Sequence, residues 1–281
     1  LWADRAWSRT TGRTDVVIAV LDSGIEWDSV AVLRKHYLHA AELPFPQSAD
    51  GSDLGVHDWN GDGVFNIDDW AEDPRVDPAA GQDRADHLID PSDLIATFSD
   101  GVDDDGNGYI DDISGWDFYW NDNDPYDDTR YGHGTGEAKD STAEGDDADG
   151  AIGTCPSCMA MSLRVSDSFV ADGASFASAV LYGVDNGALV IQEALGTMNH
   201  PTYASEAIEY AWDHDVLVVA SAADETAYHH NFPGVSQHTI YVHAVRYDDD
   251  SRDESESFVS YSNCTNHGVR LQLSAPSTSC S

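Results

Sequence analysis

The chain has 281 residues, and its 52 Asp and Glu outnumber its 13 Lys and Arg, which gives a formal net charge of −39 at pH 7. So acidic a chain lacks the basic face that nucleic acids and anionic membranes require, and we expect neither as a partner. Aromatic residues make up 10% of it, which excludes a disordered acidic tail, and no apolar run reaches the length of a membrane span.

The first predicted element is a strand over residues 15–21, an apolar run that ends at Asp22-Ser23-Gly24. A run that is too short for a helix and is closed by a turn signal is typical of a buried parallel strand. Asp22 therefore stands where a strand ends, although an Asp at such a place is most often a turn cap.

Residues 44–130 form an acidic insertion with little periodicity, rich in Asp, Gly, Asn and Pro, and 27 of the 41 Asp of the chain lie between residues 50 and 149. Its aromatic residues favour an ordered insertion over a disordered one. Two interpretations of the acid remain open: a solvated, halophile-type surface, or short-reach oxygen ligation of a hard cation.

Two segments of the insertion match calcium-binding loops. Residues 58–69 have the spacing of an EF-hand loop, with Gly63 at its sixth position, and residues 103–112 repeat the start of that pattern. We expect Ca²⁺ in both; the alternative is a pair of Asx-turn loops without an ion. The predicted ligands are Asp58, Asn60, Asp62, Val64, Asn66 and Asp69 in the first loop, and Asp103, Asp105, Asn107, Tyr109, Asp111 and Asp112 in the second.

From residue 160 onward, strand and helix patterns alternate. Apolar runs predict strands over residues 161–165, 188–194, 216–222 and 239–245, and spacings of three and four predict helices over 175–186 and 203–214. This alternation implies a mostly parallel sheet with helices on both faces, an α/β protein.

Four cysteines, at positions 155, 158, 264 and 280, favour two disulfides and an oxidising compartment, so we expect a secreted or periplasmic protein. A redox-active C-x-x-C or half of a zinc site is the alternative. The chain begins without a basic or apolar leader, which is typical of a mature or trimmed product.

His133 lies between two glycines, and it follows Asp22 in the order Asp…His…Ser that subtilisin uses for its triad. Over almost its whole length the chain resembles the subtilisin-like serine peptidases (subtilases). The segments that carry the resemblance are 16–27, 132–135, 152–165, 188–196, 220–225 and 232–234. The resemblance implies a subtilisin-like three-layer fold over residues 1–281, with the acidic insertion inside it, and a calcium-stabilised serine endopeptidase that acts on peptides or proteins.

The resemblance also implies roles for individual residues. His133 would act as the general base, Asp22 would orient it, and Asp224 stands at the oxyanion position, where most subtilases have Asn. An extended peptide would be clamped by Asp172, Gly173, Ala194, Leu195 and Gly196.

Three features depart from the subtilase pattern. No serine after residues 273–276 has the Gly-rich helix start of the nucleophile, so we expect a truncated or cleaved chain, with the serine on a separate C-terminal fragment and a propeptide already removed. Asp224 resembles the Asp that sedolisins have at this site, and it could stabilise an oxyanion only when protonated. Glu193 falls in a core strand, where we expect it to pair with Lys139 or Arg164. The missing serine and Asp224 favour the alternative of an inactive pseudoprotease, a calcium-dependent binding or structural module.

Overall fold

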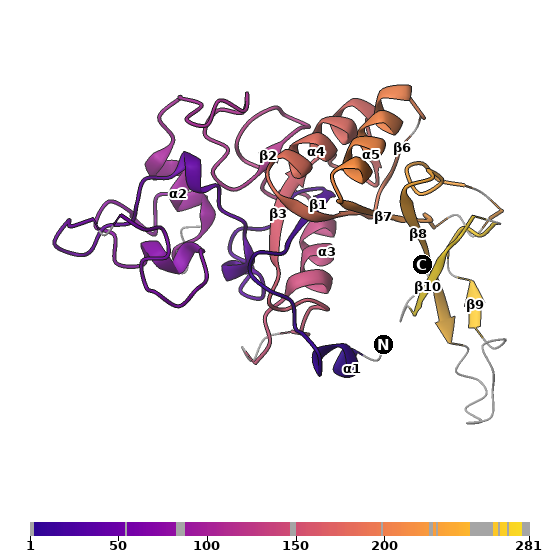
Figure 1. Ribbon diagram of the computed structural model, residues 1–281, viewed down its shortest axis with the longest axis horizontal. Helices are drawn as coiled ribbons and strands as arrows, with labels where there is room; N and C mark the ends of the chain where they lie inside the picture. Colours follow the sequence, from indigo (N-terminus) through magenta and orange to yellow (C-terminus); the bar gives the residue numbers. More distant parts are fainter. Residues whose placement is uncertain are drawn as a thin grey trace.

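The computed structural model describes residues 3–53, 55–82, 88–146, 150–197, 199–224, 227–228, 230–247, 261–263, 265–268 and 270–276. Its centre is a sheet with the strand order β10-β8-β7-β5-β1-β3-β2, and every neighbouring pair along that path is parallel. One further strand, β9, joins β8 in the antiparallel direction. The predicted α/β class with a mostly parallel sheet is confirmed (Figure 1).

The strands of this sheet are β1 (Val17–Asp22), β2 (Trp116–Asp117), β3 (Met159–Arg164), β5 (Ala188–Glu193), β7 (Leu217–Ser221), β8 (Thr239–Tyr247), β9 (Tyr261–Asn263) and β10 (Leu273–Pro276). Two short strands, β4 (Val170–Ala171) and β6 (Gly196–Thr197), pair in a separate parallel ladder. The helices are α1 (Ala3–Trp7), α2 (Pro91–Phe98), α3 (His133–Thr142), α4 (Gly173–Asp185) and α5 (Thr202–Asp213), with the short 3₁₀ helices η1 (Leu33–Lys35), η2 (Ala40–Glu42) and η3 (Ile67–Trp70).

Helices cover both faces of the sheet, and the alternation along β1 shows which face each one covers. Ala19 and Leu21 belong to the large apolar cluster that the sheet forms with α4 and α5. Ile18 and Val20 belong to a second cluster, on the α3 side, together with Ala138 of α3. Because β1 is buried on both faces, its sequence shows a continuous apolar run rather than an alternating one.

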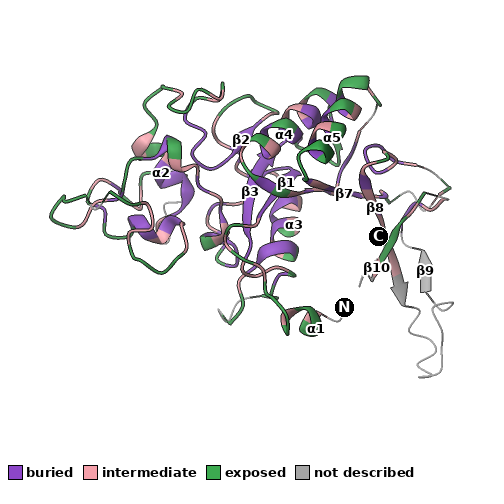
Figure 2. Ribbon diagram, viewed as in Figure 1, coloured by how far each residue is buried: buried purple, intermediate pink, exposed green. Residues whose placement is uncertain are grey.

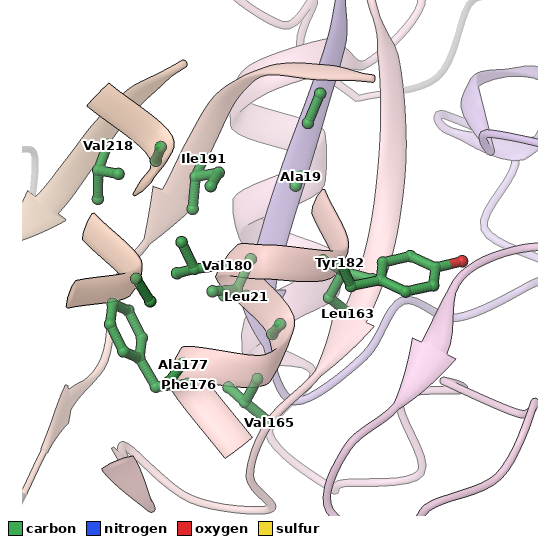
Figure 3. Close-up of a cluster of buried hydrophobic side chains, with 14 of the residues drawn as sticks. Ala19, Leu21, Leu163, Val165, Phe176, Ala177, Val180, Tyr182, Ile191 and Val218 are labelled. Carbon is green, nitrogen blue, oxygen red and sulfur yellow. The ribbon is translucent and has the colours of Figure 1, made fainter. Parts of the chain in front are cut away.

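The larger cluster is drawn in Figure 3, where side chains of α4 point onto the sheet. Phe176 and Val180 of α4 contact the layer that Leu21 and Ile191 supply from the strands, and all four side chains are at most 1% exposed. Their spacing of four is the helical period that the sequence shows over residues 175–186.

The acidic insertion packs around a third apolar core beside the main sheet, to which Leu33, Leu38 and Leu43 before the insertion also contribute (Figure 1). Trp70 and Leu94 are fully buried in that core. Figure 2 shows part of α2, the helix that carries Leu94, in the colour of buried residues. Asp90 caps α2, and Asn66 caps η3, each within a reciprocal capping box. The described part of the insertion is ordered, as its aromatic residues indicated. It also contains a helix, α2, that the weak periodicity of residues 44–130 did not indicate.

In the described part of the chain, no helix combines the length and the apolar character that crossing a bilayer requires.

Candidate active site

Asp22 and His133 meet at the carboxyl end of the central strand. Asp22 is the last residue of β1, is 1% exposed, and accepts a hydrogen bond from the backbone N–H of Ser23. His133 is the first residue of α3, and its Nδ1 lies 2.8 Å from Oδ1 and 2.9 Å from Oδ2 of Asp22. With Nδ1–H donating to the carboxylate, the second ring nitrogen, Nε2, is left able to accept a proton.

The glycine after His133 allows α3 to start this close to β1. A Cβ on Gly134 would lie 2.2 Å from the backbone oxygen of Gly24 and 3.0 Å from Cβ of Asp22. The backbone N–H of Gly134 donates to Oγ of Ser23 at 3.0 Å, which ties the helix start to the turn after β1. Any larger residue at position 134 would push His133 away from Asp22.

Carboxylates dominate the electrostatics of His133. Burial lowers its pKa, but the hydrogen bond and charge of Asp22, followed by the charges of Glu137 and Asp127, outweigh burial and raise the pKa above its usual value. A ring with this environment is a good acceptor for a hydroxyl proton, because the imidazolium that forms is stabilised by the surrounding negative charge.

His133 lies between two adjoining cavities of about 500 Å³ and about 610 Å³, and both are also lined by Ala194, Ser221 and Asp224. The larger one further contains Leu195 and Gly196. The structure thus brings together six of the eight predicted catalytic and substrate-binding residues: Asp22, His133, Asp224, Ala194, Leu195 and Gly196.

The other two predicted substrate-binding residues, Asp172 and Gly173, lie at the start of α4 and line neither cavity. Asp172 caps the helix by accepting the backbone N–H of Ala174 at 2.7 Å. The residues of this segment that do line the larger cavity are Phe169 and Val170. The predicted clamp residues Asp172 and Gly173 thus come a few positions after the part of this segment that lines the cavity.

Phe169 also forms an aromatic wall beside the base. Its ring lies edge-on to that of His133, with the ring centroids 5.0 Å apart, and the ring of Tyr131 lies 5.0 Å from Phe169 and 6.1 Å from His133. Nothing in the local sequence marked Phe169, since a lone exposed aromatic residue in a loop is common.

The smaller cavity is lined by two further carboxylates, those of Glu137 and Glu193. Glu193 is 1% exposed, and neither of its carboxylate oxygens has a hydrogen-bond partner. The predicted pairing of Glu193 with Lys139 or Arg164 is therefore wrong. Arg164 instead forms ion pairs with Asp117 at 3.5 Å and with Asp128 at 2.7 Å. Asp117 belongs to β2, and β3 and β1 separate this strand from β5, which carries Glu193.

Acidic side chains also gather outside the cleft. Among the described residues, Glu42, Asp103 and Asp105 form the one group of three potential ligands whose side-chain atoms lie within 4.8 Å of one another. Glu42 is 5% exposed; its Oε1 accepts the backbone N–H of Asp104 and Asp105, whereas its Oε2 is buried without a hydrogen-bond partner. A buried carboxylate oxygen with no partner, next to two other carboxylates, fits a hard cation such as Ca²⁺. No sequence spacing could indicate Glu42, which comes from a distant segment.

Two predicted ligands of the second loop are used differently. Asp112 is fully buried and is hydrogen-bonded to the hydroxyl of Tyr182 at 2.5 Å and to Nδ1 of His39 at 3.2 Å. Asp111 accepts the backbone N–H of Asp100 at 2.8 Å. Asn107 hydrogen-bonds Asp112, and the ring of Tyr109 packs edge-on against Tyr182. These residues support the loop from the side of the main core.

The first loop does not bring three carboxylates into one such group among the described residues. Asp58 accepts the backbone N–H of Gly61 and Gly63, Asp62 accepts that of Val64, and the buried Asp69 accepts that of Asn66. Asp58 and Asp62 thus close local turns, whereas Asp69 also joins the two ends of the loop by accepting the backbone N–H of Trp59 and Asn60.

A disulfide joins Cys155 to Cys158 in the segment before β3. The N-terminal segment packs on it, because a Cβ on Gly12 would lie 2.3 Å from Sγ of Cys155. The expected second disulfide concerns Cys264 and Cys280, which lie outside the described residues.

Comparisons with known proteins show which proteins this chain resembles. The chain is 34% identical over 165 residues to the thermophilic serine proteinase of Bacillus sp. (strain AK1), and 31% identical over 150 residues to thermitase of Thermoactinomyces vulgaris. These matches cover 58% and 53% of the chain but only 38% and 52% of the two relatives. The prenylagaramide maturation protease PagA has a similar fold, with a TM-score of 0.53 and 16% identity over 98% of this chain and 67% of that one. The family model of the subtilases matches residues 13–280, and the chain therefore belongs to the subtilase family.

Proposed function

We propose that the chain is the catalytic part of a serine endopeptidase, in which Asp22 and His133 are two members of an Asp–His–Ser triad. The observation that carries the proposal is the contact of His133 Nδ1 with both oxygens of the buried Asp22, in a cleft of the subtilase fold. His133 takes the proton of a serine hydroxyl, and Asp22 holds the ring in the tautomer with Nε2 free and stabilises the imidazolium.

Peptide substrates would bind beside β4 and β6. These two strands pair with each other through Val170 and Gly196, and Phe169 and Leu195, which precede them, line the cleft. An extended peptide that adds to these segments by backbone hydrogen bonds would present its scissile bond to His133. This assigns the clamp to residues 169–170 and 194–196 rather than to Asp172 and Gly173.

The proposal includes one structural calcium ion, held by Glu42, Asp103 and Asp105. Its support is the buried Oε2 of Glu42, which lacks a hydrogen-bond partner. When bound, Ca²⁺ would neutralise carboxylates that otherwise repel one another, and would join the end of η2 to the loop at residues 103–105. The calcium site expected in the first loop, residues 58–69, stays a prediction.

The disulfide at Cys155 and Cys158 supports an extracytoplasmic location, because such bonds persist in oxidising compartments.

The test is labelling of the full-length protein, together with any C-terminal fragment that carries the expected serine, with a fluorophosphonate probe across pH 4–9, followed by mass spectrometry of the labelled peptide. We expect one labelled serine and loss of the label in His133→Ala. Ser141 and Ser221 also line the cleft, so a label on either of them would reassign the nucleophile. Absence of labelling in a protein whose folding is verified by circular dichroism would contradict the peptidase proposal.

A binding module without peptidase activity is the second candidate. It is favoured by Asp224, which lines the cleft at the position where the resemblance places an oxyanion donor, and by the two further carboxylates, Glu137 and Glu193, beside it. Peptide binding without labelling, measured by calorimetry with the peptide products of a digest, would support this candidate.

A further inference from the structure

A second carboxylate faces His133 from its own helix. Glu137 lies one turn after His133 on α3, and its Oε1 is 3.9 Å from Nε2, the ring nitrogen on the opposite edge from Asp22. This distance is too long for a hydrogen bond, so Nε2 remains free to take a proton from a hydroxyl group. It is short enough for the carboxylate to stabilise a positive ring by charge.

Gln192 holds Glu137 in this place. Its Nε2 donates to Oε2 of Glu137 at 2.7 Å, and its Oε1 accepts a hydrogen bond from the hydroxyl of Ser141 on the same helix. Gln192 belongs to β5, next to β1, so the rigid sheet determines where Glu137 lies relative to His133. Glu137 is thus held by a hydrogen bond from the sheet and is only 29% exposed, so it is not a freely solvated surface charge.

The charged groups around His133 come from several elements. Asp22 ends β1, Asp127 precedes α3, Glu193 ends β5, and Asp224 follows β7 and lines the same cavity. His243 of β8 lines the far part of that cavity. Burial raises the pKa of Glu137, as do the charges of Asp22 and Asp140, whereas the charge of His133 and the hydrogen bond from Gln192 lower it.

We propose that Glu137 is a positioning residue for His133. Its carboxylate lies beside Nε2, so that the imidazolium formed in proton transfer has Asp22 on one edge and Glu137 on the other. The inference rests on the proposed peptidase function, because only proton transfer to His133 makes this charge useful. The charge of Glu137 would then help to set the pH above which His133 is neutral and can act as a base. A more stable imidazolium loses its proton only at a higher pH.

The test is the titration of His133 in the intact protein, followed by NMR of ¹³C-labelled histidine, with its signal assigned by its loss in His133→Gln. Glu137→Gln keeps the shape of the side chain and removes its charge, and we expect the titration midpoint of His133 to fall by about one pH unit. Asp140→Asn, which removes an exposed charge from the same helix, is the matched control and should shift the midpoint by about 0.3 pH units or less. Glu137→Asp, which keeps the charge, should retain most of the raised midpoint.

A shift in Glu137→Gln no larger than in Asp140→Asn would overturn the proposal, and so would equal shifts in Glu137→Gln and Glu137→Asp. If the protein cleaves peptides, the acidic limb of kcat/KM should move to lower pH in Glu137→Gln by the same amount as the NMR midpoint; an unmoved limb would likewise count against the role. The NMR midpoints are readable without any hydrolysis, so a failure to cleave peptides contradicts the proposed function and not the placement of Glu137.

Discussion

The acidic insertion and the cleft use carboxylates in opposite ways. In the insertion, Asp103 accepts the backbone N–H groups of Gly106 and Gly108, and these bonds, with that of Gly108 the strongest influence, lower its pKa. In the cleft, Glu193 accepts no hydrogen bond, and burial, followed by the charge of Asp22, raises its pKa well above the usual value. A carboxylate stabilises the fold where backbone N–H groups surround it, and destabilises the fold where its neighbours are apolar or acidic.

The net charge of −39 therefore has two parts with different consequences. Exposed turn-forming Asp residues such as Asp103 build local structure at little energetic cost, because backbone donors replace water. Buried capping residues such as Asp69 lie between the two cases, because burial raises the pKa that the backbone hydrogen bonds lower. Beside His133, burial raises the pKa of Glu137 and Glu193, so their ionised forms are costly to the fold, which is the pattern that functional sites show. Four predictions test this contrast, in order of decreasing expected effect.

Asp22→Asn should lower kcat for peptide hydrolysis about 10⁴-fold, because the amide favours the wrong tautomer of His133 while leaving the packing intact. Steady-state hydrolysis of a fluorogenic peptide measures this effect. Asp15→Asn, at an exposed carboxylate just before β1, is the control and should be neutral. A loss of less than tenfold in Asp22→Asn would show that this buried Asp is structural, like those of the insertion.

Asp224→Asn should raise kcat/KM at pH 8 by about 10²-fold, since an amide donates to an oxyanion at every pH and an ionised carboxylate repels it. The measurement is kcat/KM of both proteins at pH 8. An unchanged kcat/KM in Asp224→Asn would refute a place for residue 224 beside the oxyanion.

A protein in Ca²⁺ at 100 times its Kd should lose about 2–3 kcal/mol of unfolding free energy when a chelator removes the ion. Its melting temperature should fall by about 5–10 °C. Glu42→Gln should abolish the greater part of this response, which differential scanning calorimetry measures with and without chelator. Asp62→Asn, in the first loop, is the matched control and should keep the response. If the two variants behave in the opposite way, the ion belongs to residues 58–69.

Glu193→Gln should stabilise the fold at pH 8 by about 1–3 kcal/mol, because it removes a buried carboxylate that has no hydrogen-bond partner. The pKa of Glu193 is raised above its ordinary value of 4.5, so the cost is absent below about pH 4.5 and grows as the pH rises above it. Urea unfolding at pH 4.5 and pH 8 should show the gain only at pH 8. Glu206→Gln, on an exposed face of α5, is the control and should leave the unfolding free energy unchanged at both pH values. If it stabilised the fold as much as Glu193→Gln, the change in net charge alone would be responsible.

Much of the fold could be predicted from local sequence. The run at residues 15–21 and the helical spacing at 175–186 correspond to β1 and α4, because a strand buried on both faces and an amphipathic helix each have their own apolar pattern. The helix α2 has start signals in Asp90 and Pro91, a capping residue and a proline at the first turn, which our prediction did not use.

The site could be predicted only where ordered motifs mark it. Asp22 and His133 were predicted from their flanking turns and chain order, and the resemblance to the subtilases indicated the segment at Ala194–Gly196. Phe169 and Glu42 carry no motif. Their importance depends on what lies next to them, namely the ring of His133 and the carboxylates of the loop at residues 103–105.

By itself, the sequence determined the class of the fold, the order of its core elements and the candidate pair Asp22 and His133, because these depend on periodicity and on motifs local in the chain. The tertiary structure alone decided that Arg164 leaves Glu193 unpaired, that Gln192 holds Glu137 beside His133, and that Glu42 joins Asp103. Contacts of this kind join residues that are far apart in sequence, and their energies depend on burial and distance, which only the packed chain defines.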